Sequence, residues 1–254
     1  MNLPVYFRNG LPVAELPPDA SLGAGQLETM RLQGGRVPLW RLHRARLLRS
    51  GAVTPGDLEP VESTLGQFGH FPGPARVRLR FSEPGPRRSW DMAVESLDPG
   101  EGLESGVCLS LCHTRLEPSE IANPGCKLLQ RPRYNRALAE LPATGITCDG
   151  LLLDTAGRAI ETLRCNLLVR TGAGWLTPDL SRCGVRGVMR DWLRERVPVR
   201  EVDISVEMLE HAAELALCNS VRGVLPVAEL DGRSLGTPGP ETRKLQQLVT
   251  EELW

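Results

Sequence analysis

Lysine is scarce in this chain: of its 30 lysine and arginine residues, only Lys127 and Lys244 are lysines. Arginine cannot replace lysine where a neutral amine must act as a nucleophile. Lys127 lies in NPGCKLL, and these apolar surroundings would lower the pKa of its amine, because burial penalises the charged form. Lys127 is therefore a candidate nucleophile, or a surface lysine whose stem covers apolar neighbours. Lys244, in ETRKLQQL, is expected to be a solvated surface charge.

A second candidate is a carboxylate on an apolar stretch. Glu161 lies at the end of a strand pattern in RAIETLRCNLLV, and Asn166 follows it. A carboxylate in apolar surroundings needs a partner, because burying an unpaired charge is costly. Glu161 is therefore a candidate binding residue, and the alternative is an edge residue that faces water.

Three segments contain groups that could bind an anion. Residues 184–193, GVRGVMRDWL, pass from glycines into a helical pattern, and free N–H groups at a helix start attract phosphate. Their spacing is neither a P-loop nor a dinucleotide fingerprint, so a plain helix start is the alternative. Arg46, in LHRARLLRS, could clamp an oxyanion through two N–H groups or lie on the surface. Ser220 follows Asn219 at a strand end, where an Asn-Ser turn is the alternative.

Short strands and a few helices must position these residues. Over residues 76–81, apolar side chains alternate with three arginines, which predicts an antiparallel strand with one wet face. Similar patterns predict strands over residues 4–7, 90–94, 151–154, 159–162, 166–170, 199–204, 215–218 and 224–230. Helical spacing occurs over residues 39–49, 187–196, 206–213 and 241–254. Strands and helices do not alternate regularly, so we expect an α+β fold.

Composition limits the class of protein. A hydrophobic content of 41% and a net charge of -1 indicate a folded chain, and so small a charge argues against general nucleic-acid binding. No run of about 18 apolar residues predicts a membrane helix. We expect a small N-terminal domain over residues 1–112 and a larger C-terminal domain over 113–254, with a linker near 99–106 or just after Cys112.

The cysteines and histidines do not predict a metal site. The seven cysteines include no CxxC pair, and the four histidines lack metal-ligand spacing. The N-terminal segment MNLPVYFRNG lacks the pattern of a secretion signal. We therefore expect reduced thiols in a cytoplasmic protein.

Six segments, taken in order, match one family. They are LETMR (27–31), HRARL (43–47), TRLEPSEIANPGCKLLQR (114–131), LLLDTAGRAIETLRCNLL (151–168), TPDLSRCGVRGVMR (177–190) and CNSVRGVLPV (218–227). On these segments, which span most of the chain, the protein resembles the class IV aminotransferase family, the pyridoxal-phosphate enzymes of fold type IV. The resemblance implies a two-domain fold like that of D-amino acid aminotransferase, pyridoxal 5'-phosphate (PLP) as cofactor, and a homodimer with sites near the subunit interface.

The resemblance also implies roles at the cofactor ring. Lys127 falls at the position of the family's Schiff-base lysine. Glu161 matches the carboxylate that faces the pyridine nitrogen, and a carboxylate there keeps the nitrogen protonated by favouring its charged form. Asn166 matches the asparagine that follows this glutamate.

Four further residues match the family's phosphate-binding positions. Arg46 matches the phosphate-binding arginine, and Ser220 matches the hydroxyl residue of the second phosphate loop. Val188 and Met189 match the residues whose backbone N–H groups cap the phosphate. A phosphate with nearly two negative charges suits a guanidinium, a helix start and a hydroxyl.

The substrate positions separate two activities. Thr29 matches a threonine of the family's lyase branch and is expected to assist proton transfer, while Arg115 and Arg131 are expected to meet substrate carboxylates. The chain departs from the family where Arg131 and a proline stand in place of a tyrosine that contacts the ring hydroxyl, so Tyr134 or Arg131 would have to substitute. Residues 22–26, LGAGQ, also replace the usual aromatic residue and acidic glycine turn.

Three functions remain open on this basis. The resemblance favours a lyase that converts 4-amino-4-deoxychorismate to 4-aminobenzoate and pyruvate in folate biosynthesis. The alternative is an aminotransferase that acts on D- or branched-chain amino acids, and the third is a cofactor-binding or interaction protein without turnover. Release of pyruvate without a keto-acid acceptor separates the first from the second, whereas a Schiff-base absorbance that depends on Lys127 excludes the third.

Overall fold

A computed structural model of the chain describes residues 4–71, 73–83, 85, 88–97, 104–118, 125–141, 148–236 and 238–254. The chain forms two compact units. The first contains Met1–Pro99 and Cys126–Arg131, and the second contains Gly100–Gly125 and Pro132–Trp254. The expected division after residue 112 differs from these units, because 112 lies inside β6 (Val107–Leu116), which pairs with two strands of the second unit.

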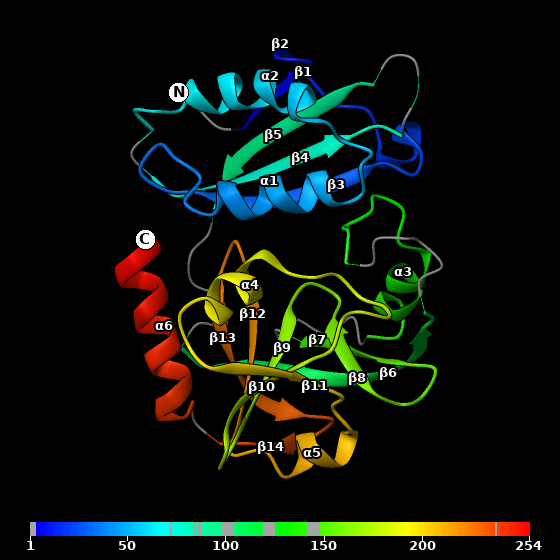
Figure 1. The fold of residues 1–254 in the computed structure, drawn as a ribbon, viewed down its shortest axis with the longest axis vertical. Coiled ribbons are helices and arrows are strands. Elements are labelled where there is room, and N and C mark those ends of the chain that lie inside the picture. The colour runs from blue at the N-terminus through cyan, green and yellow to red at the C-terminus, as the bar shows by residue number, and fades with distance from the viewer. Residues whose placement is uncertain are drawn as a thin grey trace. The chain divides into compact units, whose positions relative to one another are not determined.

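The first unit is a five-stranded sheet with two helices. Neighbouring strands are antiparallel, in the order β2-β1-β5-β4-β3. The elements are β1 (Val5–Arg8), β2 (Leu11–Val13), a 3-10 helix at Asp19–Leu22, β3 (Gln26–Leu32), α1 (Trp40–Arg49), α2 (Pro55–Gly66), β4 (Ala75–Phe81) and β5 (Trp90–Ser96). Leu47 of α1 and Leu58 and Val61 of α2 pack in one buried cluster with side chains of the sheet (Figure 1).

The strand expected over residues 76–81 is confirmed as β4, and its apolar face is buried. One prediction for its polar face is wrong. Arg80 does not face water: it is only 3% exposed, and it forms ion pairs with Asp91 of β5 at 2.6 Å and with Asp19 at 2.5 Å. The alternating pattern within β4 cannot reveal these carboxylates, because they come from other elements.

Two elements of the first unit escape the sequence patterns. The side chains of β3 alternate regularly between buried and partly exposed, but its buried face includes Gln26 and Glu28, so the hydrophobic alternation is hidden. Helix α2 begins with a capping box between Thr54 and Asp57, and Pro60 lies inside it. A proline within a helical pattern normally argues against a helix, which obscures this one.

The second unit is built on a nine-stranded sheet. Its main order is β11-β10-β9-β12-β13-β6-β7-β8, and β14 pairs with β13. These strands are β6 (Val107–Leu116), β7 (Cys148–Asp154), β8 (Ala159–Thr162), β9 (Asn166–Thr171), β10 (Gly174–Pro178), β11 (Val199–Val202), β12 (Glu214–Asn219), β13 (Gly223–Leu230) and β14 (Arg233–Ser234). An additional pairing between β8 and β9 closes six of them into a ring, β9-β12-β13-β6-β7-β8.

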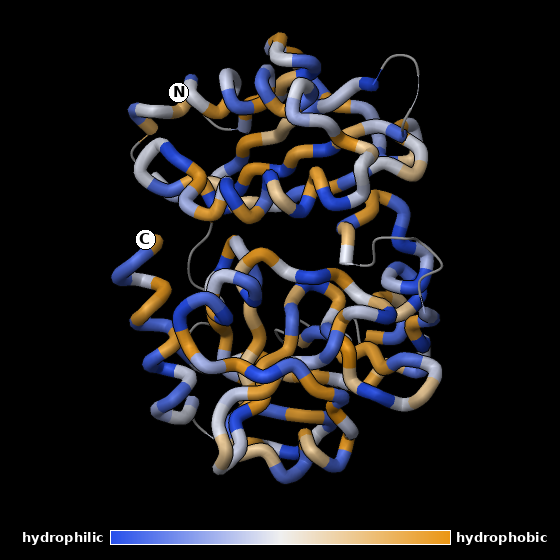
Figure 2. Tube along the Cα trace, viewed as in Figure 1, coloured by the Kyte–Doolittle hydropathy of each residue, from blue (hydrophilic) through white to orange (hydrophobic). Residues whose placement is uncertain are grey.

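Four helices accompany this sheet: α3 (Pro132–Leu138), α4 (Val188–Arg194), α5 (Val206–Glu210) and α6 (Pro240–Leu253). Helix α6 lies along β13 and β12 (Figure 1). Hydrophilic and hydrophobic segments alternate along α6 in Figure 2, and Leu245 and Val249 are among its buried residues. Lys244 is 71% exposed on this helix, as expected.

The mixed α+β fold class is confirmed, and the strands and helices expected for the second unit occur at the expected places. Helix α3 and strand β10 are additional elements that the sequence patterns do not identify. No helix among the described residues has both the length and the apolar character needed to cross a membrane. All seven cysteines lie in described segments, and each is a free thiol.

Candidate active site

Lys127 is held by the edge of the first unit's sheet. The N–H of Leu27 donates to the carbonyl of Lys127 at 2.9 Å, and the N–H of Leu129 donates to the carbonyl of Gly25 at 2.9 Å. Gln26 and Leu128 form an antiparallel bridge between these contacts. The segment Cys126–Arg131 therefore runs along β3, the edge strand of its sheet, as a short extra partner.

This register determines the residues that Lys127 meets. Lys127 lies opposite Leu27, so it shares a sheet face with Leu27 and Thr29, because side chains alternate along a strand. The half-buried Lys127 donates from Nζ to the Thr29 hydroxyl oxygen at 3.4 Å. The structure therefore brings together the two residues that the sequence nominated for catalysis.

The opposite face of β3 carries a buried polar cluster made by Glu28, His43 and Arg46. Arg46 donates from Nε to Glu28 Oε1 at 2.7 Å and from Nη2 to Glu28 Oε2 at 2.5 Å. His43 Nδ1 lies 2.5 Å from the same Oε2. His43 and Arg46 are three residues apart in α1, so they project from one side of the helix toward β3.

Burial and charge act against each other in this cluster. Burial alone would raise the pKa of Glu28, but the charges and hydrogen bonds of Arg46 and His43 lower it to about 2. Burial lowers the pKa of His43, the positive charges of Arg46 and Lys127 lower it further, and Glu28 opposes the shift. Glu28 is therefore ionised and His43 neutral at physiological pH.

The second unit places Glu161 and Asn166 directly opposite each other in β8 and β9. Glu161 is 3% exposed. Its Oε1 accepts from the N–H of Val185 at 2.9 Å and from the Tyr134 hydroxyl, and its Oε2 accepts from Asn166 Nδ2 at 3.3 Å. Glu161 is thus a buried and oriented carboxylate, which excludes the interpretation of a water-facing edge residue.

Asn166 and Gly187 make a close approach beside this carboxylate. Asn166 Nδ2 donates to the carbonyl of Val185 at 2.9 Å. A Cβ on Gly187 would lie 1.7 Å from Asn166 Oδ1, so only glycine fits at this position. Gly187 is also the N-cap of α4, and it is followed by the buried residues Val188 and Met189. The helix start expected near 187 is confirmed, and it lies against Asn166.

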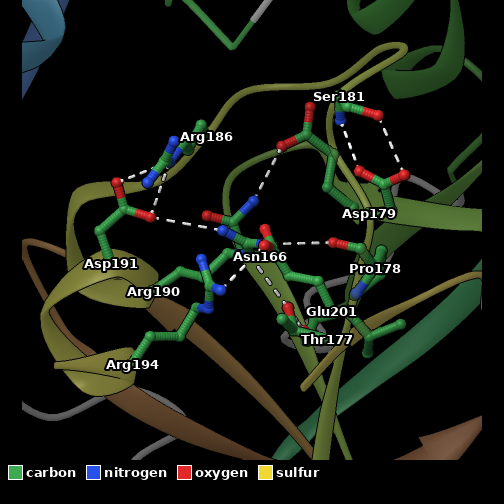
Figure 3. Close-up of polar contacts among 12 residues, drawn as sticks. Asn166, Thr177, Pro178, Asp179, Ser181, Arg186, Arg190, Asp191, Arg194 and Glu201 are labelled. Atoms are coloured by element: carbon green, nitrogen blue, oxygen red, sulfur yellow. Dashed lines mark hydrogen bonds and ion pairs between the residues drawn. The ribbon is translucent and has the colours of Figure 1, made fainter. Parts of the chain in front are cut away.

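A buried arginine anchors α4 to the neighbouring strands (Figure 3). Arg190 is fully buried, and it donates from Nε to the Thr177 hydroxyl at 3.1 Å and from Nη2 to the carbonyl of Pro178 at 3.1 Å. It also pairs with Glu201 of β11 and with Asp191. These contacts fix the helix on β10 and β11, and therefore fix the backbone of Val188 and Met189.

The turn after β12 holds Ser220. Asn219 Oδ1 accepts from the N–H of Val221 at 3.0 Å and from the N–H of Arg222 at 2.8 Å. Its Nδ2 lies 3.1 Å from Cys165 Sγ in the neighbouring segment. The side chain of Asn219 therefore shapes the turn that carries the Ser220 hydroxyl.

The remaining candidates are distributed between the two units. Arg115, in β6 of the second unit, donates to the carbonyls of Cys112 and His113 on its own strand. Arg131 ends the segment Cys126–Arg131 of the first unit. Tyr134, considered above for the ring hydroxyl, donates instead to Glu161.

Sequence reasoning missed the contact of Glu28 and His43 with Arg46. The signal that could have found it is the three-residue spacing of His43 and Arg46 in a helical pattern, together with the carboxylate of Glu28 in the neighbouring LETMR segment. Two such donors on one helix face require a buried acceptor.

The comparisons with known proteins agree with this arrangement. The family model for class IV amino-transferases matches residues 25–230, so the chain belongs to this family, whose members are PLP-dependent enzymes. The resemblance stated from the six segments is therefore confirmed.

Within the family, two relatives are similar over nearly their whole length. The aminodeoxychorismate lyase of Vibrio harveyi is 28% identical over 280 residues, which cover 95% of this chain and 98% of the relative. The crystal structure of 4-amino-4-deoxychorismate lyase from Pseudomonas aeruginosa has 31% identity and a TM-score of 0.82, and covers 98% of this chain and 99% of its own. The branched-chain amino acid aminotransferase of Escherichia coli, at 20% identity and a TM-score of 0.78, covers 97% of this chain and 93% of its own and shares the fold.

Proposed function

We propose that this protein is a PLP-dependent lyase that converts 4-amino-4-deoxychorismate to 4-aminobenzoate and pyruvate, a step of folate biosynthesis. The observation that carries the proposal is the contact of 3.4 Å between Lys127 Nζ and Thr29 Oγ1, because Thr29 matches the family's lyase branch. The two full-length relatives described as lyases of this substrate support it.

The donor set of the described residues fits PLP. Lys127 supplies an amine for the aldehyde of the cofactor, and Glu161 supplies a buried carboxylate for the ring nitrogen. Arg46 supplies a buried guanidinium for the phosphate, together with the hydroxyl of Ser220 and the backbone N–H groups of Val188 and Met189. A guanidinium and backbone N–H groups are both common phosphate ligands in proteins.

Asn166 would act on the cofactor through Glu161. Its hydrogen bonds to Glu161 and to the carbonyl of Val185 hold the carboxylate in one orientation. The N–H of Val185 donates to the other oxygen of Glu161. Fixed hydrogen bonds of this kind position a binding carboxylate before its ligand arrives.

When bound, PLP supplies a ring that stabilises negative charge on the substrate carbon that carries the amine. Lys127 removes the proton from that carbon, and the bond between the adjacent carbon and the enolpyruvyl oxygen breaks. The leaving enolpyruvate takes up one proton and becomes pyruvate, which balances the proton that Lys127 removed. Loss of both groups makes the substrate ring aromatic, as 4-aminobenzoate.

Thr29 would orient the amine during this transfer. Its hydroxyl lies close enough to Nζ to hold the amine over one face of the sheet. In an aminotransferase, Lys127 would instead return the proton to the cofactor, so the two reactions differ in where one proton goes. Arg115 and Arg131 are proposed to meet the substrate carboxylates.

The experiment that tests this proposal supplies purified protein with 4-amino-4-deoxychorismate and no keto acid. Pyruvate is followed with lactate dehydrogenase and NADH, and 4-aminobenzoate by chromatography. We expect equal amounts of the two products. Transfer of the amino group from a D- or branched-chain amino acid to 2-oxoglutarate, without pyruvate release in the first assay, would overturn the lyase and identify an aminotransferase.

We also propose that the enzyme is a homodimer and cytoplasmic. The family resemblance supports the dimer, and the seven free thiols agree with a reducing compartment. Analytical ultracentrifugation of the purified protein tests the first point, and cell fractionation tests the second.

A further inference from the structure

The proposed reaction leaves one buried polar cluster without a role. Glu28, His43 and Arg46 are 1%, 0% and 5% exposed, and Arg46 alone has a proposed ligand. The cluster lies close enough to Lys127 for the charge of this lysine to act on His43. Glu28 and His43 are therefore buried polar groups beside the proposed active site that the chemistry described so far does not use.

The contacts define the direction in which each hydrogen bond runs. Glu28 is ionised, so its carboxylate only accepts, and His43 must donate from Nδ1. Because His43 is neutral, its other nitrogen, Nε2, carries a lone pair; it is buried and has no hydrogen-bond partner in the part of the chain that the structure describes. The hydrogen bond from Nδ1 to Glu28 thus accounts for a polar ring at this position.

Glu28 in turn orients Arg46. Its two oxygens accept from Nε and Nη2, which are two of the three nitrogens of the guanidinium and lie along one edge. A two-point contact fixes both the plane and the rotation of the guanidinium, whereas a single hydrogen bond would leave it free to turn. His43 holds Oε2, the oxygen that accepts from Nη2, so His43 steadies the carboxylate that steadies Arg46.

The geometry points to Glu28 and His43 as positioning residues that orient Arg46 for the phosphate of the cofactor. The order of support runs from His43 to Glu28 to Arg46, and the guanidinium is oriented before the cofactor binds. This inference rests on the phosphate role of Arg46 in the proposed function, but it is independent of the choice between lyase and aminotransferase.

A purely structural role is the competing explanation. Buried ion pairs are weak contributors to stability, because the cost of removing charges from water offsets their attraction. A cluster kept only for packing would tolerate apolar side chains of similar size and would suffer when a side chain is shortened. A positioning role predicts the opposite order, since it depends on the donor at one nitrogen of His43.

The test uses substitutions that conserve charge. H43L keeps most of the volume of the neutral ring but removes the donor, whereas H43N leaves a gap but places an amide N–H near the position of Nδ1. E28D keeps the negative charge but withdraws the carboxylate from Arg46 by one methylene. Full-length protein freed of cofactor is titrated with PLP and with pyridoxal, which carries the same aldehyde without the phosphate.

We expect H43L and E28D to bind PLP about 10- to 100-fold more weakly than the unsubstituted chain, as is typical when a support behind a binding residue is lost. H43N should retain most of the affinity for PLP, and all three variants should bind pyridoxal as the unsubstituted chain does. Thermal unfolding of each variant provides the measure of structural damage.

Three results would overturn the inference: an equal loss of PLP and pyridoxal affinity, tighter PLP binding by H43L than by H43N, or no preference of the unsubstituted chain for PLP over pyridoxal. If E28D does not fold, the two variants of His43 still decide. Failure of the lyase assay would leave the ratio of PLP to pyridoxal affinity unaffected, so the two proposals can fail separately.

Discussion

Glu161 and Asn166 face each other across β8 and β9, and this pair joins the two strands that close the ring of the second unit. The turn between them is tight, since the N–H of Thr162 donates to the carbonyl of Cys165 at 2.9 Å. The same pair provides the carboxylate proposed for the ring nitrogen and the amide that orients it. Closure of the strand ring and construction of the site are therefore one structural event.

Gly187 tests how closely the site depends on this pair. In G187A, the new Cβ would occupy the space of Asn166 Oδ1, 1.7 Å away, so Asn166 must move and lose its contacts with Glu161 and Val185. We expect the free energy of unfolding to fall by about 1–3 kcal/mol, as in other overpacked sites, and PLP to bind more weakly. Urea unfolding and PLP titration measure the two effects.

G172A is the matched control for G187A. Gly172 lies in an exposed turn of the same unit, and a Cβ there would meet nothing within 4 Å. We expect its free energy of unfolding to change by no more than about 0.5 kcal/mol. Equal effects of the two substitutions would contradict the packing argument.

Lys127 tests the requirement for an amine. K127R keeps a positive charge at the edge of β3 but removes the nucleophile, because a guanidinium does not lose its proton at physiological pH. We expect loss of the visible absorbance of the bound cofactor and a fall in pyruvate release of at least about 10²-fold, the lower bound for losing a positioned acid–base group. K244R on α6 is the control and should behave as the unsubstituted chain. Retention of the absorbance by K127R would exclude Lys127 as the attachment point.

Thr29 tests the proton-transfer step. T29V keeps the shape of the side chain but removes the hydroxyl that Lys127 contacts, whereas T29S keeps the hydroxyl. We expect T29V to lower kcat for pyruvate release by about 10- to 100-fold, the usual value of a hydrogen bond to a charged group, and T29S to have a much smaller effect. PLP affinity should stay unchanged in both. A T29V enzyme with unaltered kcat would remove Thr29 from the mechanism.

The buried cluster predicts how stability depends on pH. The pKa of Glu28 is about 2 in the folded chain, against an ordinary value of 4.5, so the unfolded chain binds the proton first as pH falls. Its contribution is complete above pH 4.5 and is lost toward pH 2; a shift of this size corresponds to about 3 kcal/mol. The pKa of His43 is lowered from 6.5 and acts in the same direction, with loss beginning as pH falls below 6.5.

Urea unfolding measured between pH 7 and pH 3 checks this dependence. E28Q should lose part of the fall in stability between pH 4.5 and pH 3, because it has no carboxylate to protonate there. E95Q is the control, because it removes the carboxylate of a more exposed pair with Arg76. An acid profile of E28Q that matches that of the unsubstituted chain would show that Glu28 does not contribute.

The local patterns of the sequence predict much of the fold. Alternation predicts β4 and the strands that carry Glu161 and Asn166, and helical spacing predicts α1 and α4, which carry Arg46 and Met189. They fail at β3, whose buried face includes Gln26 and Glu28, and at α2, which contains a proline. In both cases the side chains that decide burial belong to other elements.

By itself the sequence determined the local elements and the identity of the candidate residues, Lys127 and Glu161 above all, because strand and helix periodicity and motif spacing depend on residues close together in the chain. Only the tertiary structure decided which polar groups meet: Lys127 with Thr29, and Glu28 with His43 and Arg46. The physical reason is that these contacts depend on the register of residues 126–131 along β3 and on the burial of α1 against it. Both are set by long-range packing, which no local pattern encodes.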